Sequence, residues 1–480
     1  MTDFSSGLDL AAAIRRRELT AVEALDASLE AIDRLNPTLN AVIWRDDEGA
    51  RAEAARADEA LASGDADALP PFHGVPLPIK DLTPVAGWPV TYGSHGAPEG
   101  PSEESELVVD AFRRAGFVLC GRTNTPEFGP ITVTENLRYG PTCNPWDPSR
   151  SPGGSSGGAA AATAAGMFPL AHANDGGGSI RIPAACCGLV GLKPSRGRVP
   201  RLTQSWEGAA VEGVVTHTVS DSAAVLDAIA GVDRLGWWSA PQPSRPYADE
   251  VGAEQAPLRV GLATGAPLGL PLDDSCADAA RHCAELLEGL GHSVEPVQFD
   301  TLPGDLVEPF LAFVRAGFAD FPGVDWSKTE PHNRAGYEDA QHLTALQYAE
   351  ASRYLQLRSR ELVAPFGRDF DVLVTPTLSI EQPQVGSVLE AAHATPGEPV
   401  VPVIQMIAFT MFGNLTGLPA ISLPLHWTES GLPAGAQIMG GAWDEATLIR
   451  LASALEEAAP WADRRPDTAA LEANVPQPAP

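Results

Sequence analysis

Positive charge is scarce in this 480-residue sequence, and lysine is nearly absent. There are 32 Lys and Arg against 62 Asp and Glu, which gives a formal net charge of -30. This balance disfavours unaided binding to nucleic acid or to an anionic membrane, so we expect neither as a partner. The only lysines are Lys80, Lys193 and Lys328. Because arginine keeps its proton in proteins whereas a desolvated lysine can lose it, a lysine in this background is a candidate for chemistry that arginine cannot perform.

Long apolar runs and paired cysteine spacings are also missing. No uninterrupted run of about 18 apolar residues predicts a membrane-spanning helix. The start, MTDFSSGLDL, has no basic stretch before an apolar one, so we expect no export signal and a cytoplasmic protein. No CxxC or HxxxH pair has zinc-ligand spacing, so we predict buried reduced thiols and no bound metal. The cysteines are Cys120, Cys143, Cys186, Cys187, Cys276 and Cys283.

Helical and extended patterns alternate along the chain. Residues 7–63 have the apolar periodicity of helices. Short apolar runs predict strands at 74–82 and 117–120, and buried strands at 258–264 and 370–378. This alternation is typical of an α/β layered fold around a mixed sheet.

No internal repeat and no clear linker divides the sequence. We therefore predict one large domain over residues 66–465, with an N-terminal helical layer, residues 1–65, packed on its core. The sequence ends in the proline-rich ALEANVPQPAP. This composition predicts a flexible tail over residues 466–480.

Two glycine- and serine-rich stretches need an explanation, because consecutive glycines lose much backbone entropy on folding. They are PGGSSGGA at 152–159 and DGGGSIR at 175–181. Neither is followed by the Lys-Ser or Lys-Thr of a P-loop, and neither fits GxGxxG after a strand, which disfavours phosphate binding. The first stretch matches the GxSxG elbow of an α/β-hydrolase around Ser155, but the preceding NPWDPSRSP contains no apolar strand. An esterase that uses Ser155 therefore stays an alternative.

A serine nucleophile with a lysine base is the third interpretation. Serine needs a nearby base to take its proton. Lys80 follows the apolar Leu77, Pro78 and Ile79, a setting that would lower its pKa. A lysine that reaches from a strand end to solvent explains the same residues equally well. His172 is the one histidine close to a glycine-serine stretch, and a structural role suits it better than a catalytic one.

The glycines of DGGGSIR have two open interpretations. Residues without a Cβ let backbone N–H groups converge on the oxyanion that forms during amide hydrolysis. A glycine-rich turn with no further role is the simpler alternative.

Taken together and in this order, these segments resemble the amidase signature family. The stretch from Gly153 to Val199 is similar to that family's glycine- and serine-rich signature nearly from end to end. The resemblance extends over roughly residues 8–465. Further similar segments are GVPLPIKDL (74–82), GRTNTPEFG (121–129), FDVLVTPT (370–377) and GNLTGLPAISLPL (413–425).

The resemblance implies a Ser-cisSer-Lys triad without metal or cofactor. In that arrangement Ser179 is the nucleophile, Ser155 is the bridging serine in a cis peptide and Lys80 is the base. The resemblance also implies an oxyanion hole, formed by the backbone N–H groups of Gly176, Gly177, Gly178 and Ser179. Two departures stand out: Asn174 precedes Asp175 where family members commonly have threonine, and Gly176 occupies a variable position.

The implied fold is an α/β fold whose central mixed sheet carries helices on both faces, with residues 66–465 as the catalytic domain. The sequence looks most like bacterial amidases of the 6-aminohexanoate cyclic dimer hydrolase type, which suggests a linear or cyclic small-molecule amide as substrate. We expect the acyl pocket to come from the variable segments 200–240, 305–350 and 400–415. A homodimer is the candidate assembly.

The alternative within the family is the glutamine-hydrolysing subunit of a tRNA-dependent amidotransferase. That subunit has the same triad. The region 305–345 contains nothing similar to its NLSRYDG stretch, so a stand-alone amidase is favoured.

Overall fold

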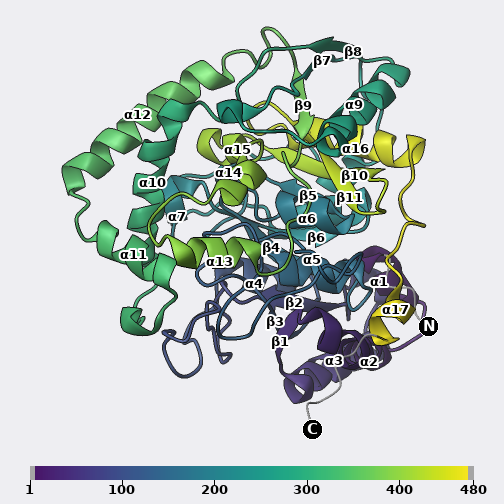
Figure 1. Ribbon diagram of the computed structural model, residues 1–480. Coiled ribbons are helices and arrows are strands. Elements are labelled where there is room, and N and C mark those ends of the chain that lie inside the picture. The colour runs from purple at the N-terminus through teal and green to yellow at the C-terminus, as the bar shows by residue number, and fades with distance from the viewer. Residues whose placement is uncertain (1–5, 474–480) are drawn as a thin grey trace.

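Two β-sheets form the centre of the molecule (Figure 1). The computed structural model describes residues 6–473. The strands are β1 (Val42–Arg45), β2 (Pro76–Lys80), β3 (Val118–Thr123), β4 (Leu170–Asp175), β5 (Val190–Lys193), β6 (Val211–Thr216), β7 (Arg259–Leu262), β8 (Ser293–Pro296), β9 (Val372–Pro376), β10 (Ala420–Trp427) and β11 (Pro433–Met439). The larger sheet has eight strands in the order β4-β6-β5-β10-β11-β9-β7-β8, and the smaller has the order β1-β3-β2. Neighbouring strands pair antiparallel along β4-β6-β5-β10-β11-β9, whereas β7 pairs parallel with both β9 and β8. The sheet is therefore mixed, as predicted.

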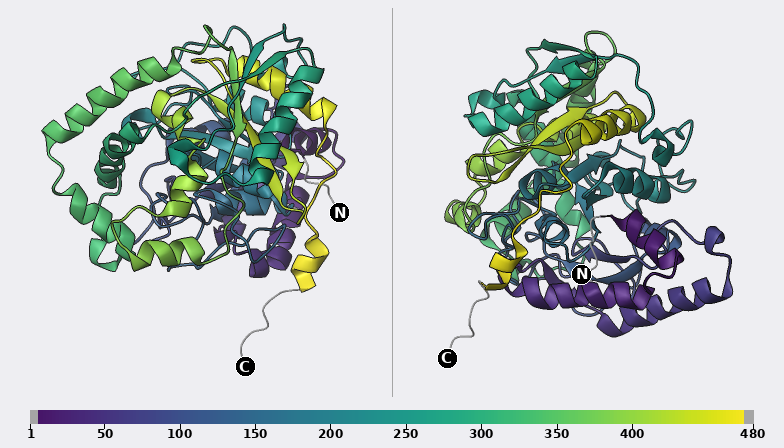
Figure 2. Two further views of the ribbon diagram at one scale, coloured as in Figure 1. Left: turned by 45° about the horizontal axis from the view of Figure 1, so that its top comes forward. Right: turned by 90° about the vertical axis from the view of Figure 1, so that its right-hand side faces the viewer.

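Helices surround the sheets. They are α1 (Gly7–Arg15), α2 (Ala21–Leu39), α3 (Asp47–Ser63), α4 (Leu107–Arg114), α5 (Gly157–Ala164), α6 (Arg181–Cys187), α7 (Ser205–Gly208), α8 (Val219–Ile229), α9 (Asp274–Gly289), α10 (Val307–Ala316), α11 (Pro331–Ala340), α12 (Ala345–Val363), α13 (Ser387–Ala394), α14 (Val401–Ile407), α15 (Met411–Thr416), α16 (Glu445–Ala458) and α17 (Thr468–Ala473). Helices α10 to α13 extend beside the sheets as an arm, green in Figures 1 and 2.

Both faces of the larger sheet are covered, as predicted. Successive side chains of a strand point to opposite faces. Val214 of β6 belongs to a buried cluster with residues of α8 and α16, whereas its neighbour Val215 belongs to a cluster with residues of α5 and α6. The α/β prediction is therefore confirmed.

The smaller sheet meets the larger one at strand β4. Strand β2 is buried along its whole length and ends at Lys80. The backbone N–H of Lys80 donates to Nδ1 of His172 on β4 at 3.2 Å, and the Lys80 side chain reaches Asn174 on the same strand. The ends of β2 and β4 are thus held together, and this junction places Lys80 next to the glycine-rich loop that follows β4.

One part of the N-terminal region differs from the sequence expectation. The predicted helical stretch 7–63 is interrupted by β1, because its backbone groups pair with β3. Helix α2 continues past Pro37 to Leu39, and Asn36 stabilises the following turn by accepting hydrogen bonds from the N–H groups of Ala41 and Val42.

The predicted flexible tail is wrong for residues 468–473. These residues form α17, whose Leu471 is buried against α2. The hydroxyl of Thr38 donates to the carbonyl of Leu471 at 2.9 Å. The remainder of the predicted tail, residues 474–480, lies outside the described residues.

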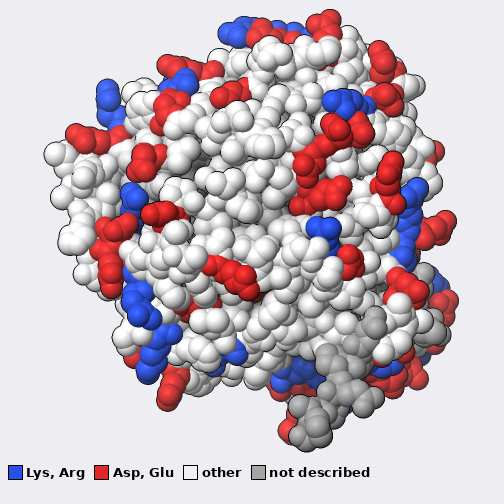
Figure 3. Space-filling model, viewed as in Figure 1, with Lys and Arg blue, Asp and Glu red and all other residues white. Residues whose placement is uncertain are grey.

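The composition also led to expectations about membrane-spanning helices, cysteines and surface charge, which residues 6–473 of the structure address. In this part of the chain, no helix is long and apolar enough to cross a membrane. All six cysteines are free; five are buried, and Cys143 is half-buried. On the face shown in Figure 3, acidic residues are spread over the surface and basic residues mostly lie beside them, without a continuous basic patch.

Candidate active site

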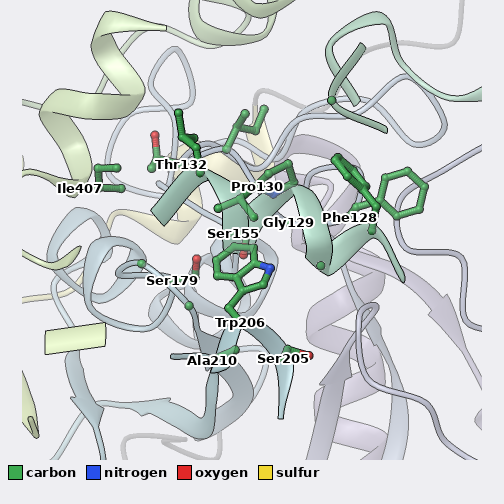
Figure 4. Close-up of a pocket in the computed structure, with 18 of the residues that line it drawn as sticks. Phe128, Gly129, Pro130, Thr132, Ser155, Ser179, Ser205, Trp206, Ala210 and Ile407 are labelled. Carbon is green, nitrogen blue, oxygen red and sulfur yellow. The ribbon is translucent and has the colours of Figure 1, made fainter. Parts of the chain in front are cut away.

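A cavity of about 460 Å³ opens between the helical arm and the ends of β2 and β4. Its lining includes Ser155 and Ser179, both labelled in Figure 4. Parts of all three segments expected to form a pocket contribute to its wall, from Arg201 to Glu212, from Val307 to Asp339 and from Val400 to Met411. Residues of the two glycine- and serine-rich stretches and of the variable segments therefore line the same cavity.

The Lys80 side chain is fully buried beside this cavity. Its exposed fraction is 0%. Burial penalises the ammonium form and lowers the pKa of Lys80 to about 7, against a smaller opposing effect of the carboxylates of Glu212 and Asp175. Because Lys80 does not reach solvent, the structure excludes the alternative of a lysine that extends from the end of a strand into solvent. A neutral amine is accessible at this position near neutral pH.

The three oxygen partners of Lys80 define how a neutral amine is oriented. Nζ lies 2.7 Å from Ser155 Oγ, 2.9 Å from Ser156 Oγ and 2.7 Å from Asn174 Oδ1. The amide oxygen of Asn174 can only accept a hydrogen bond. The Ser156 hydroxyl donates to the backbone carbonyl of Asn174 at 3.2 Å, and therefore also accepts from the amine. A neutral amine has two N–H groups and one lone pair, so the lone pair is left for the Ser155 hydroxyl. In the neutral form of Lys80, this arrangement directs the lone pair at the Ser155 hydroxyl.

Ser155 lies in a turn between buried backbone segments. The Gly154–Ser155 peptide bond is cis, and α5 begins at Gly157. A Cβ on Gly154 would lie 2.8 Å from backbone atoms of Thr132 and Val133, so glycine is needed for this close approach. No strand leads into Ser155, since residues 124–156 contain none. The strand-turn-helix context of a hydrolase elbow is therefore missing.

Asp175 holds the glycine-rich loop that carries Ser179. Its carboxylate accepts from the N–H groups of Gly178 at 2.7 Å and Ile180 at 3.2 Å, and it pairs with the guanidinium of Arg181 at 2.9 Å. Asp175 and Arg181 are both fully buried. Although burial alone would raise the pKa of Asp175, the combined effect of Arg181, Lys193 and Asn414 outweighs it and lowers the pKa to about 2. Asp175 is thus ionised and fixes the loop from both sides of Ser179.

The loop leaves three backbone donors available, and Gly178 is not one of them. The N–H of Gly178 is taken by Asp175, and Gly178 does not line the cavity. The N–H of Gly178 is thus occupied in this structure, and a contribution of Gly178 to an oxyanion hole stays a prediction. Within residues 6–473, the N–H groups of Gly176, Gly177 and Ser179 have no hydrogen-bond acceptor, and all three residues line the cavity.

His172 is fully engaged away from the serines. Nδ1 accepts from the backbone N–H of Lys80, and Nε2 lies 2.9 Å from the Glu212 carboxylate. Burial lowers the pKa of His172, although Glu212 opposes the shift. A neutral ring with its proton on Nε2 satisfies both contacts, so the structural role expected for His172 is supported.

Sequence reasoning missed three residues of this site. Asn174 and Ser156 complete the surroundings of Lys80. Ser156 follows the predicted Ser155, and the unusual Asn174, two residues before Gly176, was the available signal. Trp206 packs over Gly176, where a Cβ would lie 2.7 Å from its ring. Its backbone has a φ of 52°, a conformation rare for tryptophan that no sequence pattern marked. The glycine at position 176 is therefore explained by the space that Trp206 fills.

Comparison with known proteins identifies the family. The sequence profile of the family described as Amidase matches residues 23–449. The chain belongs to the amidase family. It is an amidase signature hydrolase that acts on amides.

Several amidase relatives cover nearly the whole chain. A 6-aminohexanoate-cyclic-dimer hydrolase from a Pseudomonas strain is 36% identical, over 94% of each chain. An acylamidase from Rhodococcus erythropolis is 33% identical, over 96% of this chain and 97% of its own. A solved structure of 6-aminohexanoate cyclic dimer hydrolase complexed with substrate is 34% identical, with a TM-score of 0.90 over 98% of this chain and 100% of that chain. The amidase fold is therefore shared along its full length.

The Asp175–Arg181 pair predicts a large loss of stability on removal of its negative charge. Asp175→Asn leaves the buried Arg181 guanidinium without charge compensation, so we expect the free energy of unfolding to fall by about 3–5 kcal/mol. Urea denaturation followed by circular dichroism measures this. Asp369→Asn, which breaks a surface pair with Arg368, is the control and should leave stability nearly unchanged. Equal denaturation midpoints for Asp175→Asn and wild type would contradict the account.

Proposed function

We propose that this amidase hydrolyses small amides through an acyl-enzyme on Ser179, with Ser155 as proton relay and Lys80 as base. The observation that carries the proposal is the contact of 2.7 Å between the buried Lys80 amine and Ser155 Oγ. The lone pair of the neutral amine accepts the Ser155 proton, and Ser155 Oγ accepts the proton of Ser179. The Ser179 oxygen, activated in this way, then attacks the amide carbonyl carbon.

The developing oxyanion is stabilised by backbone donors. Attack on the carbonyl forms a C–O bond to Ser179 and moves an electron pair to the carbonyl oxygen. The N–H groups of Gly176, Gly177 and Ser179 are the candidate donors, because they face the cavity without another acceptor. Asp175 holds the loop in place before substrate arrives, so little reorganisation is needed during the reaction.

The same relay then returns the proton. Protonated Lys80 gives a proton through Ser155 to the leaving nitrogen as the C–N bond breaks, and an amine departs. Water is next deprotonated by the same pair and attacks the acyl-enzyme, which releases a carboxylic acid and restores Ser179. No step requires a metal or cofactor.

A linear or cyclic aliphatic amide is the substrate class that the cavity supports best. Its volume of about 460 Å³ is in the usual range for small-molecule sites. Large apolar side chains dominate its wall, including Phe128, Trp206, Phe310, Phe318 and Met411. Relatives named for a cyclic dimer of 6-aminohexanoate and for acylamides favour the same class.

The alternatives find less support. An esterase built on Ser155 would need a strand before that serine, and its hydroxyl is already engaged by Lys80. A glutamine-hydrolysing amidotransferase subunit would use the same triad, but the mainly apolar wall of the cavity favours an apolar amide over glutamine. A homodimer and a cytoplasmic location remain predictions from the sequence.

Ser179 is expected to carry the acyl group. Ser179→Ala should lower kcat by roughly 10⁶-fold, because the nucleophile is removed, while the fold remains intact. Labelling with a fluorophosphonate followed by peptide mass spectrometry should locate the modification on Ser179. Ser205→Ala, a second serine in the cavity wall, is the control and should keep both labelling and turnover. A label on Ser155 would overturn the assignment of roles.

The rate should depend on the protonation of Lys80. Below its pKa of about 7 the amine is charged and cannot accept a proton, so kcat/KM should rise with pH and level off above pH 7. Lys80→Arg should reduce kcat by at least about 100-fold near neutral pH, since arginine stays protonated. Lys328→Arg at the exposed lysine is the control. Full activity of a folded Lys80→Arg variant would exclude Lys80 as the base.

A panel of amides tests the substrate class. Linear and cyclic aliphatic amides, aryl amides, dipeptide amides and glutamine are compared by kcat/KM. We expect the aliphatic amides to exceed glutamine by at least tenfold, because the cavity wall is mainly apolar. Glutamine hydrolysis that appears only with added partner subunits would instead favour the amidotransferase alternative.

A further inference from the structure

A group of metal-ligating side chains lies in the helical arm, apart from Lys80, Ser155 and Ser179. Glu330 is the residue before α11, His332 lies in the first turn of that helix, and His393 lies near the end of α13. One donor atom from each of these side chains falls within 4.8 Å of the others. Glu330 Oε2 is 3.1 Å from His393 Nε2 and 3.8 Å from His332 Nδ1. Two elements distant in sequence thus bring a carboxylate and two imidazoles to one point.

His332 is the unusual member of this group. Both of its ring nitrogens are buried and have no hydrogen-bond partner within residues 6–473. The 3.8 Å separation from Glu330 is too long for a hydrogen bond. Buried polar atoms are nearly always satisfied in native proteins, and a neutral imidazole contains one donor and one acceptor. The His332 ring therefore has binding capacity that no neighbouring side chain of the described residues uses.

The charge around the group favours a cation. Glu330 is only 3% exposed, and two further buried carboxylates, Glu127 and Glu135, are each 1% exposed. The Glu127 carboxylate accepts from the backbone N–H of Glu330 at 2.8 Å, and Oε2 of Glu135 has no partner. Within residues 6–473, none of these three glutamates forms a salt bridge with lysine or arginine. Buried carboxylates are normally paired with a cation or coordinated to a metal, and no lysine or arginine of the described residues pairs with these three.

We propose that Glu330, His332 and His393 bind a divalent transition-metal ion of the Zn²⁺ type. Imidazole nitrogen with carboxylate oxygen is a donor set that suits Zn²⁺. Ligand atoms about 2.0–2.1 Å from a tetrahedral zinc ion are about 3.3 Å from one another. The two separations from Glu330, 3.1 and 3.8 Å, bracket that value, and all three ligand atoms lie within 4.8 Å of one another, so side-chain rotations can complete the site.

This metal site would be part of the cavity wall. His332 lines the cavity together with Ala392, the neighbour of His393. Three protein ligands leave one coordination position of a tetrahedral ion for water or another oxygen ligand. The site does not include any residue of the proposed proton relay, so the binding of metal and the identity of the nucleophile are independent claims.

Metal binding to the whole protein tests the proposal. Tag-free protein is stripped with a chelator, dialysed and titrated with ZnCl₂ alone by isothermal titration calorimetry. We expect one Zn²⁺ per chain, and at least a tenfold loss of affinity in His332→Ala, His393→Ala and Glu330→Gln. His282→Ala is the matched control, because His282 is an exposed histidine on α9, and it should bind as wild type does. Absence of binding to the wild type, or equal affinity in His332→Ala and His282→Ala, would overturn the proposal.

A second measurement keeps the test decisive if a variant fails to fold. Co²⁺ added to the stripped wild-type protein should give the visible absorption of a tetrahedral site with nitrogen and oxygen ligands, and one equivalent of Zn²⁺ should abolish it. A wild-type spectrum identical to that of Co²⁺ in buffer would also overturn the proposal.

Discussion

The amino group of Lys80 is held away from water among three oxygen atoms, and the proposed chemistry depends on this desolvation. An exposed lysine would be charged at neutral pH and could not accept a proton from serine. Burial disfavours the ammonium form and lowers the pKa of Lys80 to about 7. The hydrogen-bond partners then determine how the neutral amine is oriented. Asn174 and Ser156 accept its two N–H groups, so its lone pair is directed at Ser155. In the proposed mechanism, one buried side chain thus supplies the base and determines which serine gives it a proton.

The fold builds this environment from two sheets that meet at β2 and β4. The Lys80 backbone is fixed to His172, and that histidine is held in turn by Glu212. On the other side of the junction, the ion pair of Asp175 and Arg181 fixes the loop after β4. A buried ion pair contributes little net stability compared with an apolar pair, yet removal of one partner is costly. We infer that this pair defines the shape of the loop more than it stabilises the fold.

Much of this site could be predicted from the sequence, because its main residues lie in two contiguous segments and one lysine-containing strand. The scarcity of lysine and the long resemblance to the amidase signature indicated Lys80, Ser155 and Ser179. The role of each backbone N–H was not predictable, because the sequence does not distinguish three consecutive glycines. Only the structure shows that the N–H of Gly178 donates to Asp175. Asn174 was noticed as a departure, but its contact with Lys80 depends on how the two sheets meet.

Other features depend on contacts between distant segments and left little sequence signal. Trp206 reaches Gly176 from the short helix α7 through a left-handed backbone conformation. The group of Glu330, His332 and His393 assembles only when α11 and α13 pack, and its spacing matches no metal-binding motif. The segment that forms α17 was expected to belong to a flexible tail because the end of the sequence is rich in proline. Instead, Leu471 is buried against α2.

The protonation of Lys80 can be measured directly, because the chain has only three lysines. Protein labelled with ¹³C at lysine Cε gives a small set of NMR resonances, and the Lys80→Arg variant identifies that of Lys80. This comparison also separates it from Lys193, whose buried amine has its pKa lowered to about 7. The account predicts that the Lys80 resonance titrates near pH 7. A Lys80 amine that stays protonated until about pH 10, as in an exposed lysine, would contradict the central claim.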